Sequence, residues 1–186
     1  MTDSQQYNEE EIVAQLHDNA TCREAFTKVI NHYTQPLYWQ IRRIVIDHDD
    51  TNDLLQNTFM KAWTNIDSFR GDAKLSTWLY KIAINESITF INKEKLRNQL
   101  SIDDEDSFLI NNLESDEWFD GDDLKLQLQK AINKLPEKQR LVFNMRYYDE
   151  MKYEDMSEIL GTSVGALKAS YHHAVKKIEE FFSDDD

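Results

Sequence analysis

Three sets of side chains in this sequence suit binding, and one set lies on a helical stripe between residues 75 and 97. Polar side chains recur there at helical spacing and a basic cluster follows: Trp78, Lys81, Asn85, Thr89 and Asn92, then Lys93, Lys95 and Arg97. Aromatic rings stack on unpaired bases, amides bind base edges, and cations contact phosphate. The stripe therefore suits single-stranded nucleic acid, although a Trp at this spacing could equally belong to a core.

A second candidate surface lies on a predicted helix over residues 51–66. Leu55, Phe59, Ala62 and Ile66 recur at i, i+4, i+7 and i+11, which is the spacing of a core-facing side. The opposite side carries Asp53, Gln56, Asn57, Met60 and Thr64. It lacks the mixture of Lys and Glu that is typical of a solvated helix. A surface of this kind suits a contact with protein better than one with nucleic acid, although simple solvation would also account for it.

The third set follows a turn at Leu160-Gly161-Thr162, where Gly161 can adopt the left-handed conformation that ends one helix and Ser163 can cap the next. Helix, short turn with Gly, and helix is the pattern of a helix-turn-helix unit, although two-helix hairpins are common. Small side chains allow close approach to a DNA groove, and Lys and His can reach bases or phosphates. The exposed side of the second helix is expected to carry Gly165, Ala166, Lys168, Ala169, His172, His173 and Lys176.

Neither a metal site nor a catalytic site is predicted. The histidines are scattered, and no Cys or carboxylate has ligand spacing with them: His17, His32, His48, His172 and His173. The single cysteine, Cys22, excludes an intramolecular disulfide. No cofactor is implied, and we expect that the protein is not an enzyme.

The elements that must position these residues are predicted to be helices. The chain of 186 residues contains only 4 Gly and 2 Pro, and strand alternation is nowhere sustained. A proline at position 36 interrupts the pattern of the second helix, which we expect to kink or restart there. The predicted helices cover residues 9–17, 21–47, 51–66, 75–97, 123–134, 137–148, 153–160 and 163–182.

Charge divides the chain into segments. The net charge of −14 argues against nonspecific DNA binding by the whole molecule, but residues 99–123 alone hold ten acids and no base. Residues 20–98 and 124–182 each hold two more bases than acids. Self-repulsion should keep the acidic segment extended, so we expect two small helical domains joined by an acidic linker. The predicted segments are a first domain over 1–98, a linker over 99–122, a second domain over 123–182 and an acidic tail over 183–186.

No apolar run approaches the roughly 18 residues that a membrane span needs, and the acidic, polar N-terminus is not a secretory signal. We therefore expect a cytoplasmic protein without membrane insertion.

Together these segments resemble the sigma factors of bacterial RNA polymerase, specifically the extracytoplasmic-function group. DDTNDLLQNTFMKAW resembles the region 2 helix, whose usual form is D-A-E-D-L-x-Q-E-x-F-x-x-A-W, and FRGDAKLSTWLYKIAINESITFIN resembles the promoter-melting segment. LPEKQRLVFNMRYYDEMKYEDMSEILGTSVGALKASYHHAVKKI resembles region 4 and its helix-turn-helix. The resemblance covers most of the chain outside the linker and the extreme termini. It implies a region 2 bundle followed by a region 4 domain.

The resemblance also implies roles for residues. Contact with the clamp helices of the largest polymerase subunit would involve Asp53, Leu54, Gln56, Asn57 and Met60. Binding and melting of the −10 element would involve Phe69, Arg70, Lys74, Trp78, Lys81, Asn85, Lys93 and Arg97. Reading of the −35 element would involve Ser163, Gly165, Ala166, Lys168, Ala169, His172, His173 and Lys176. The implied partners are core RNA polymerase, including its flap region, and promoter DNA; an inhibitory anti-sigma factor is common in this group.

The sequence departs from the family pattern at several positions. Asn57 stands where the family usually has Glu, and Ser170, His173 and Val175 stand where it usually has Arg. The second helix of the helix-turn-helix is therefore less basic, and we expect fewer phosphate contacts. Lys152 also replaces the expected capping residue.

Other functions remain open from the sequence. A stand-alone helix-turn-helix repressor or activator would bind duplex DNA without polymerase, but no dimerisation heptad is evident and residues 75–97 would have no role in it. An acidic adaptor or anti-sigma protein that mimics DNA is the other alternative, and the two basic segments count against it.

Overall fold

The computed structural model describes residues 7–98 and 123–183, and every regular element within those ranges is a helix. The N-terminal half (7–98) contains α1 (Glu9–Leu16), α2 (Cys22–Val45), α3 (His48–Thr64), the 3-10 helix η1 (Ile66–Ser68) and α4 (Leu75–Asn98). The C-terminal half (123–183) contains α6 (Asp123–Asn133), α7 (Glu137–Tyr147), α8 (Tyr153–Leu160) and α9 (Val164–Ser183). The predicted all-α fold is confirmed. The predicted linker over 99–122 and residues 184–186 of the predicted tail lie outside the described residues.

Helix α2 runs as one helix past Pro36, so of the two predicted outcomes, a kink or a restart, the restart does not occur. Pro36 lies on the exposed side, whereas Tyr33, Leu37 and Ile41 are buried. A proline inside a helix costs about 3 kcal/mol. Burial of one large apolar side chain contributes roughly 1.5–3 kcal/mol. The buried residues around Pro36 therefore outweigh the hydrogen bond that the proline removes.

Helix α3 begins at His48 and not at residue 51 as predicted. Asp47 caps the helix, because its side chain accepts hydrogen bonds from the backbone N–H groups of Asp49 and Asp50 at 2.8 and 2.9 Å. The polar residues after the cap obscured the start, since they extend the helix by one turn without adding to its apolar pattern.

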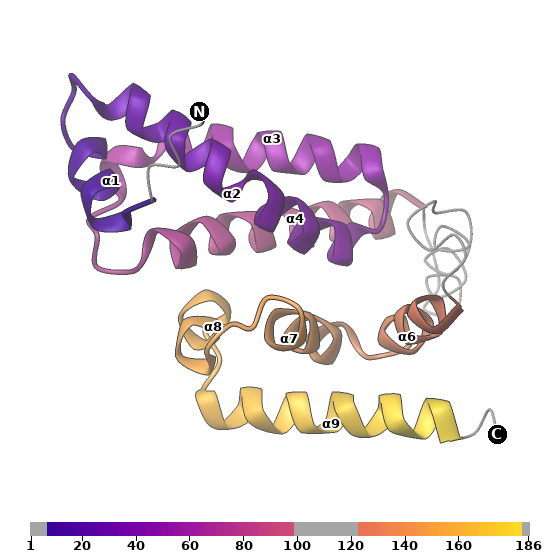
Figure 1. Cartoon of the computed structure of the whole chain (residues 1–186). Helices are drawn as coiled ribbons and strands as arrows, with labels where there is room; N and C mark the ends of the chain where they lie inside the picture. Colours follow the sequence, from indigo (N-terminus) through magenta and orange to yellow (C-terminus); the bar gives the residue numbers. More distant parts are fainter. Residues whose placement is uncertain (1–6, 99–122, 184–186) are drawn as a thin grey trace.

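Helix α4 is buried on two sides. Leu75, Leu79 and Ala83 belong to the core that α4 forms with α1, α2 and α3. Ile84 belongs instead to a core of the C-terminal half, where it packs with Val142 and other buried residues. Figure 1 shows the result: α4 lies between α3 and the layer formed by α7 and α8, and α9 runs along the far side of that layer. Helix α4 therefore packs against both halves of the chain.

Charged side chains complete the contact between the halves. Arg43 of α2 donates a hydrogen bond to Asp149, and their side chains are only 9% and 6% exposed. Burial raises the pKa of Asp149 to about 6, although the neighbouring Arg43 guanidinium acts in the opposite direction. Two further ion pairs, which are more exposed, also join the halves. Lys74 in the loop before α4 lies 3.5 Å from Asp155, and Lys95 of α4 lies 3.3 Å from Glu137.

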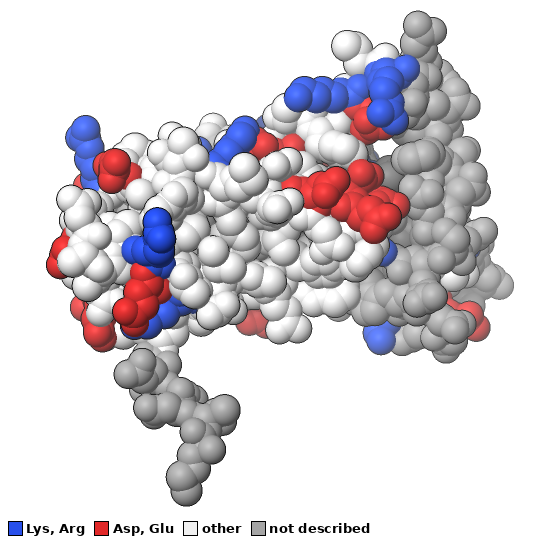
Figure 2. Space-filling view, turned by 90° about the horizontal axis from the view of Figure 1, so that it is seen from above, with Lys and Arg blue, Asp and Glu red and all other residues white. Residues whose placement is uncertain are grey.

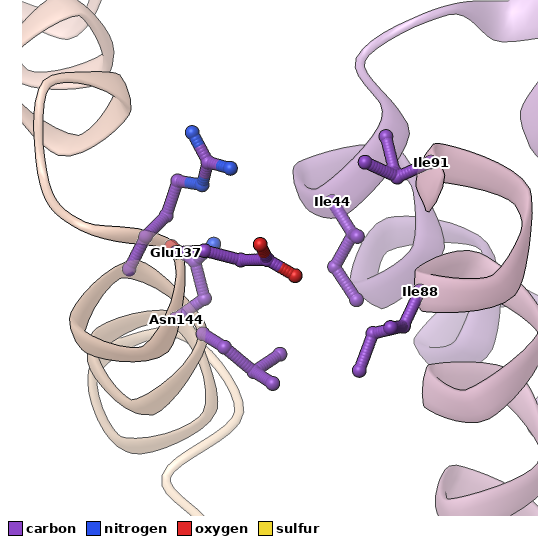
Figure 3. Close-up of a pocket in the computed structure, with 7 residues that line it drawn as sticks. Ile44, Ile88, Ile91, Glu137 and Asn144 are labelled. Carbon is purple, nitrogen blue, oxygen red and sulfur yellow. The ribbon is translucent and has the colours of Figure 1, made fainter. Parts of the chain in front are cut away.

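A small cavity of about 20 Å³ remains between the halves. Figure 3 shows Ile44, Ile88 and Ile91 of the N-terminal half facing Glu137 and Asn144 of α7 across this space. The space is about large enough for a single water molecule, so the halves pack closely here.

We predict that Asp149→Ala separates the two halves. Removing one partner of a buried ion pair leaves the other charge uncompensated and typically costs about 3–5 kcal/mol. The matched control is Asp155→Ala, which removes a partly exposed pair of the same contact and should cost less than about 1 kcal/mol. Small-angle X-ray scattering would measure the radius of gyration, with circular dichroism to verify helix content. An unchanged radius for Asp149→Ala would contradict the prediction.

Candidate protein and nucleic-acid interfaces

The outer side of α3 is an exposed surface. Asp53, Gln56, Asn57 and Met60 are all exposed there, and Met60 retains 60% of its accessible surface. Leu54 does not belong to this surface: it is 5% exposed and lies in the N-terminal core. Position 54 is turned toward the same core as Leu55, so the predicted contact of Leu54 with a partner stays a prediction and requires Leu54 to leave that core.

An apolar groove of about 510 Å³ lies beside this surface, between α2 and α3. Its lining residues are Arg23, Phe26, Thr27, Ile30, Gln56, Phe59, Met60 and Trp63. Trp63 is 41% exposed, and its ring lies 5.0 Å from that of Phe26. The sequence analysis missed Trp63, although Gln56, Met60 and Trp63 recur at i, i+4 and i+7 and that spacing places them on one side of a helix. Groove and outer side of α3 together form what we call the α3 surface.

The charge on this side of the molecule is unevenly distributed. Seen from above in Figure 2, the face formed by α2 and α3 has a broad uncharged area, and acidic side chains gather toward the end where α3 begins. Burial and the nearby carboxylates, Asp47 first among them, raise the pKa of Asp50. Repulsion among these acids can be relieved by a basic partner. The α3 surface therefore fits a protein that presents apolar and basic side chains together.

The loop before α4 presents two of the predicted nucleic-acid contacts. Arg70 and Lys74 are exposed, and Gly71 turns the chain between them with a φ of 75°. Phe69 is only 4% exposed, and its ring packs 5.0 Å from that of the half-buried Trp78. Phe69 therefore faces the core in this structure, and its predicted contact with DNA stays a prediction. The Phe69 ring is part of the N-terminal core and packs against the ring of Trp78.

Helix α4 carries the remaining predicted contacts on its exposed side. Lys81, Asn85, Lys93 and Arg97 are exposed. Ile84 lies between Lys81 and Asn85 along the helix but is buried under the C-terminal half. The predicted nucleic-acid stripe and the contact between the halves are therefore neighbours on the same helix.

The turn between α8 and α9 has the predicted geometry. Gly161 is left-handed, with φ 62° and ψ 28°, and donates its N–H to the carbonyl oxygen of Ser157 at 2.9 Å. Ser163 caps α9 by accepting a hydrogen bond from the N–H of Ala166 at 3.3 Å. Lys152 precedes α8 without a side-chain capping bond, as its residue type led us to expect. A helix-turn-helix geometry is thus fixed by local residues.

Helix α9 exposes every residue predicted to read DNA. These are Ser163 at its cap and Gly165, Ala166, Lys168, Ala169, His172, His173 and Lys176 along its length. The opposite side is buried through Leu167, Ala174 and Ile178. The Lys168 ammonium lies 5.6 Å from the centre of the Tyr153 ring of α8, and a cation over an aromatic face is attracted to it. Tyr153 thus holds one cation of the exposed side near the start of the helix.

The described residues contain neither a candidate metal site nor a candidate membrane span. Within 7–98 and 123–183, no cluster of His, Cys, Asp and Glu has a geometry that could hold a metal ion. None of the helices in those ranges is both long and apolar enough to cross a membrane.

Two family models match the chain. The model described as Sigma-70 region 2 matches residues 29–97, and the model described as Sigma-70, region 4 matches residues 125–178. The first match contains all of α3 and most of α4, and the second contains the helix-turn-helix.

Curated relatives match over nearly their whole length. The chain is 30% identical to the ECF RNA polymerase sigma factor SigW of Bacillus subtilis over 170 residues, which cover 87% of this chain and 91% of the relative. It is 27% identical to the ECF RNA polymerase sigma-E factor of Haemophilus influenzae, with coverage of 84% and 87%.

Solved structures show the same arrangement of helices. The sigma factor RpoE in complex with the anti-sigma factor NepR from Bartonella quintana has a TM-score of 0.68 and 25% identity, covering 87% of this chain and 98% of that chain. CnrH in complex with the cytosolic domain of CnrY has a TM-score of 0.69 and 20% identity, covering 96% and 99%, and it supports the fold alone.

We predict that Gly161→Ala destabilises the C-terminal half. The left-handed conformation costs a residue with a Cβ about 1–2 kcal/mol, and the turn requires it. The control is Gly165→Ala, because Gly165 has no positive φ and a Cβ there would meet no atom within 4 Å. Alanine should stabilise α9 at this position by about 0.5–1 kcal/mol. Thermal unfolding would compare the two variants; equal midpoints would show that the turn does not depend on Gly161.

Proposed function

The chain belongs to the extracytoplasmic-function sigma factors of bacterial RNA polymerase, and from that premise we propose that it binds core polymerase and directs it to promoters. In this proposal the N-terminal half melts the −10 element and the C-terminal half reads the −35 element. One observation carries the proposal: the chain combines an exposed α3 surface suited to protein with a helix-turn-helix suited to duplex DNA. A repressor that acts alone would need only the second.

The α3 surface would bind the clamp helices of the largest polymerase subunit. Asp53, Gln56 and Asn57 supply polar contacts on the outer side, and Met60 and Trp63 supply exposed apolar area. Anchoring side chains from the partner would enter the groove, because buried apolar and aromatic contacts give most of the affinity of a protein interface. Asn57 replaces an acid of the family pattern, so this interface has one charge fewer.

Single-stranded −10 DNA would bind along the loop 69–74 and α4. Arg70, Lys81 and Lys93 would contact phosphates, while Trp78 and Asn85 would contact bases. Lys74 already pairs with Asp155 at 3.5 Å, so its use by DNA requires a phosphate to replace that carboxylate. The proposal thus makes DNA binding compete with the pairing of Lys74 and Asp155 of α8.

Duplex −35 DNA would bind the exposed side of α9. Gly165, Ala166 and Ala169 permit close approach, and Lys168, His172 and Lys176 reach toward bases or phosphates. The family arginines missing at Ser170, His173 and Val175 make this reader weaker. Two weak readers on one chain become selective when they bind together, because the second binding event is intramolecular.

An inhibitory protein partner is also proposed. The similar structure of RpoE is a complex with an anti-sigma factor. The α3 surface contains the apolar groove of about 510 Å³, and an inhibitor that covered this surface would exclude polymerase.

We predict that the chain co-elutes with bacterial core RNA polymerase on size exclusion and that Asp53→Arg/Gln56→Arg abolishes this. Both substitutions place a bulky cation on the exposed outer side of α3, where an acid and an amide now stand. Lys168→Glu is the control, because it reverses a charge on α9 and should keep polymerase binding while losing promoter binding. Absence of co-elution together with tight duplex binding by the free chain would favour a stand-alone repressor.

We predict that Lys176→Ala weakens promoter binding through loss of one phosphate contact. The slope of log affinity against log salt should then become shallower by about 1. Lys177→Ala is the control: this exposed lysine is the next residue, turned about 100° around α9. Fluorescence anisotropy of holoenzyme on a labelled promoter at several salt concentrations would measure both slopes. Identical changes in the two variants would argue against the assigned side of α9.

A further inference from the structure

Helix α1 has no role in the function proposed above, yet one side of it touches the loop 69–74 and the start of α4. Glu9, Val13 and His17 follow one another at i, i+4 and i+8, so they lie on the same side of the helix. We infer that α1 fixes the conformation of the DNA-binding loop and that Glu9 is a positioning residue for single-stranded −10 DNA. This inference rests on the proposed function and assigns a part of its machinery.

Glu9 connects three helices through one carboxylate. Its Oε1 accepts a hydrogen bond from the backbone N–H of Leu75 at 2.9 Å, and its Oε2 accepts one from the hydroxyl of Tyr33 at 3.0 Å. Leu75 is the first residue of α4, where backbone N–H groups have no partner within the helix. The preceding residue is Lys74, whose side chain has donors only and cannot cap. A residue 66 positions earlier in the chain therefore supplies the cap of α4.

The other two residues of this side support the loop itself. Gly71 has a φ of 75°, and a Cβ on it would lie 3.7 Å from Cγ1 of Val13. The ring of His17 lies nearly parallel to that of Phe69, with centres 6.5 Å apart. Helix α1 and the residue that follows it thus lie beside the loop at its first residue and at its turn, and α1 bonds the residue after the loop.

The adjoining, buried side of α1 makes this support rigid. Ile12 and Leu16 are buried in the N-terminal core, so α1 cannot move without exposing them. Between the supported points, Arg70 and Lys74 remain exposed. A loop that is ordered in advance loses less conformational entropy when it binds DNA. The contacts of α1 therefore favour binding without touching the DNA.

The chemistry of the cap predicts a graded series of variants. Glu9→Ala removes both acceptors, whereas Glu9→Gln keeps one neutral carbonyl acceptor for the N–H of Leu75. Hydrogen bonds to charged groups are stronger than those between neutral groups. Glu10→Ala is the matched control, because it removes an exposed acid from the same turn. Ile12→Ala is a second control that destabilises α1 from its core side.

The experiment compares holoenzymes made with these full-length variants. Core-polymerase affinity would be measured by titration, and promoter melting by permanganate reactivity of the −10 thymines. We expect Glu9→Ala to lower the melted fraction roughly tenfold, with core affinity unchanged, Glu9→Gln to restore most of the melting, and Glu10→Ala to behave like wild type. A loss for Glu9→Ala no greater than that of Ile12→Ala at an equal fall in unfolding temperature would reduce Glu9 to a structural role and overturn the inference.

A second measurement needs no polymerase. Amide hydrogen exchange of the free chain should be faster across residues 69–75 in Glu9→Ala and unchanged in Glu10→Ala. Equal protection in both variants would refute the positioning role even if melting were affected. If wild-type protein fails to form a holoenzyme while exchange follows this pattern, the proposed function fails and the support of the loop by α1 stands.

Discussion

The burial of α4 on two sides is the constraint on which the arrangement of the described residues depends. Leu79 and Ala83 must remain in the N-terminal core, and Ile84 must remain in the C-terminal one. Because these residues are adjacent on the helix, neither core can shift along or around α4 without disturbing the other. The pair of Arg43 and Asp149 then fixes the orientation. Burial raises the pKa of Asp149 even with Arg43 beside it, so the desolvation of the carboxylate outweighs its attraction to the guanidinium. The pair therefore determines how the halves are oriented more than it stabilises their contact.

The functional surfaces are distributed unequally around this contact. The α3 surface lies on the far side of the N-terminal half from α7 and α8, so it is exposed while the halves are packed together (Figure 1). Lys74 and Ile84 lie at the contact itself. The surface assigned to polymerase is therefore accessible in the arrangement seen here, whereas the surface assigned to −10 DNA is partly engaged by the C-terminal half.

The sequence predicted most of the helices and of the exposed sides, because both follow from local rules. The apolar spacing of α3 and α9, and the Gly161 turn with its Ser163 cap, are set within a few residues and were predicted. Features that depend on distant residues were not. Leu54 and Phe69 were assigned to interfaces because their motif positions suggested it, but their burial is decided by helices far away in the chain. The acceptor at Leu75 is another such case, since nothing near Lys74 indicates that Glu9 will reach it.

The engagement of Lys74 by Asp155 has a consequence for the apparent strength of DNA binding. Suppose that DNA binds only molecules in which the two halves are separated. Its apparent affinity is then the intrinsic affinity multiplied by the fraction of separated molecules, so a separated population of roughly 1% would weaken binding about a hundredfold. Coupling of this kind is reciprocal. A partner of α3 that leaves the packing undisturbed cannot alter this factor, whereas a partner that holds the halves apart removes it entirely. The contact between α4 and the C-terminal half therefore limits the apparent affinity for DNA through the fraction of separated molecules, without any change in the residues that contact DNA.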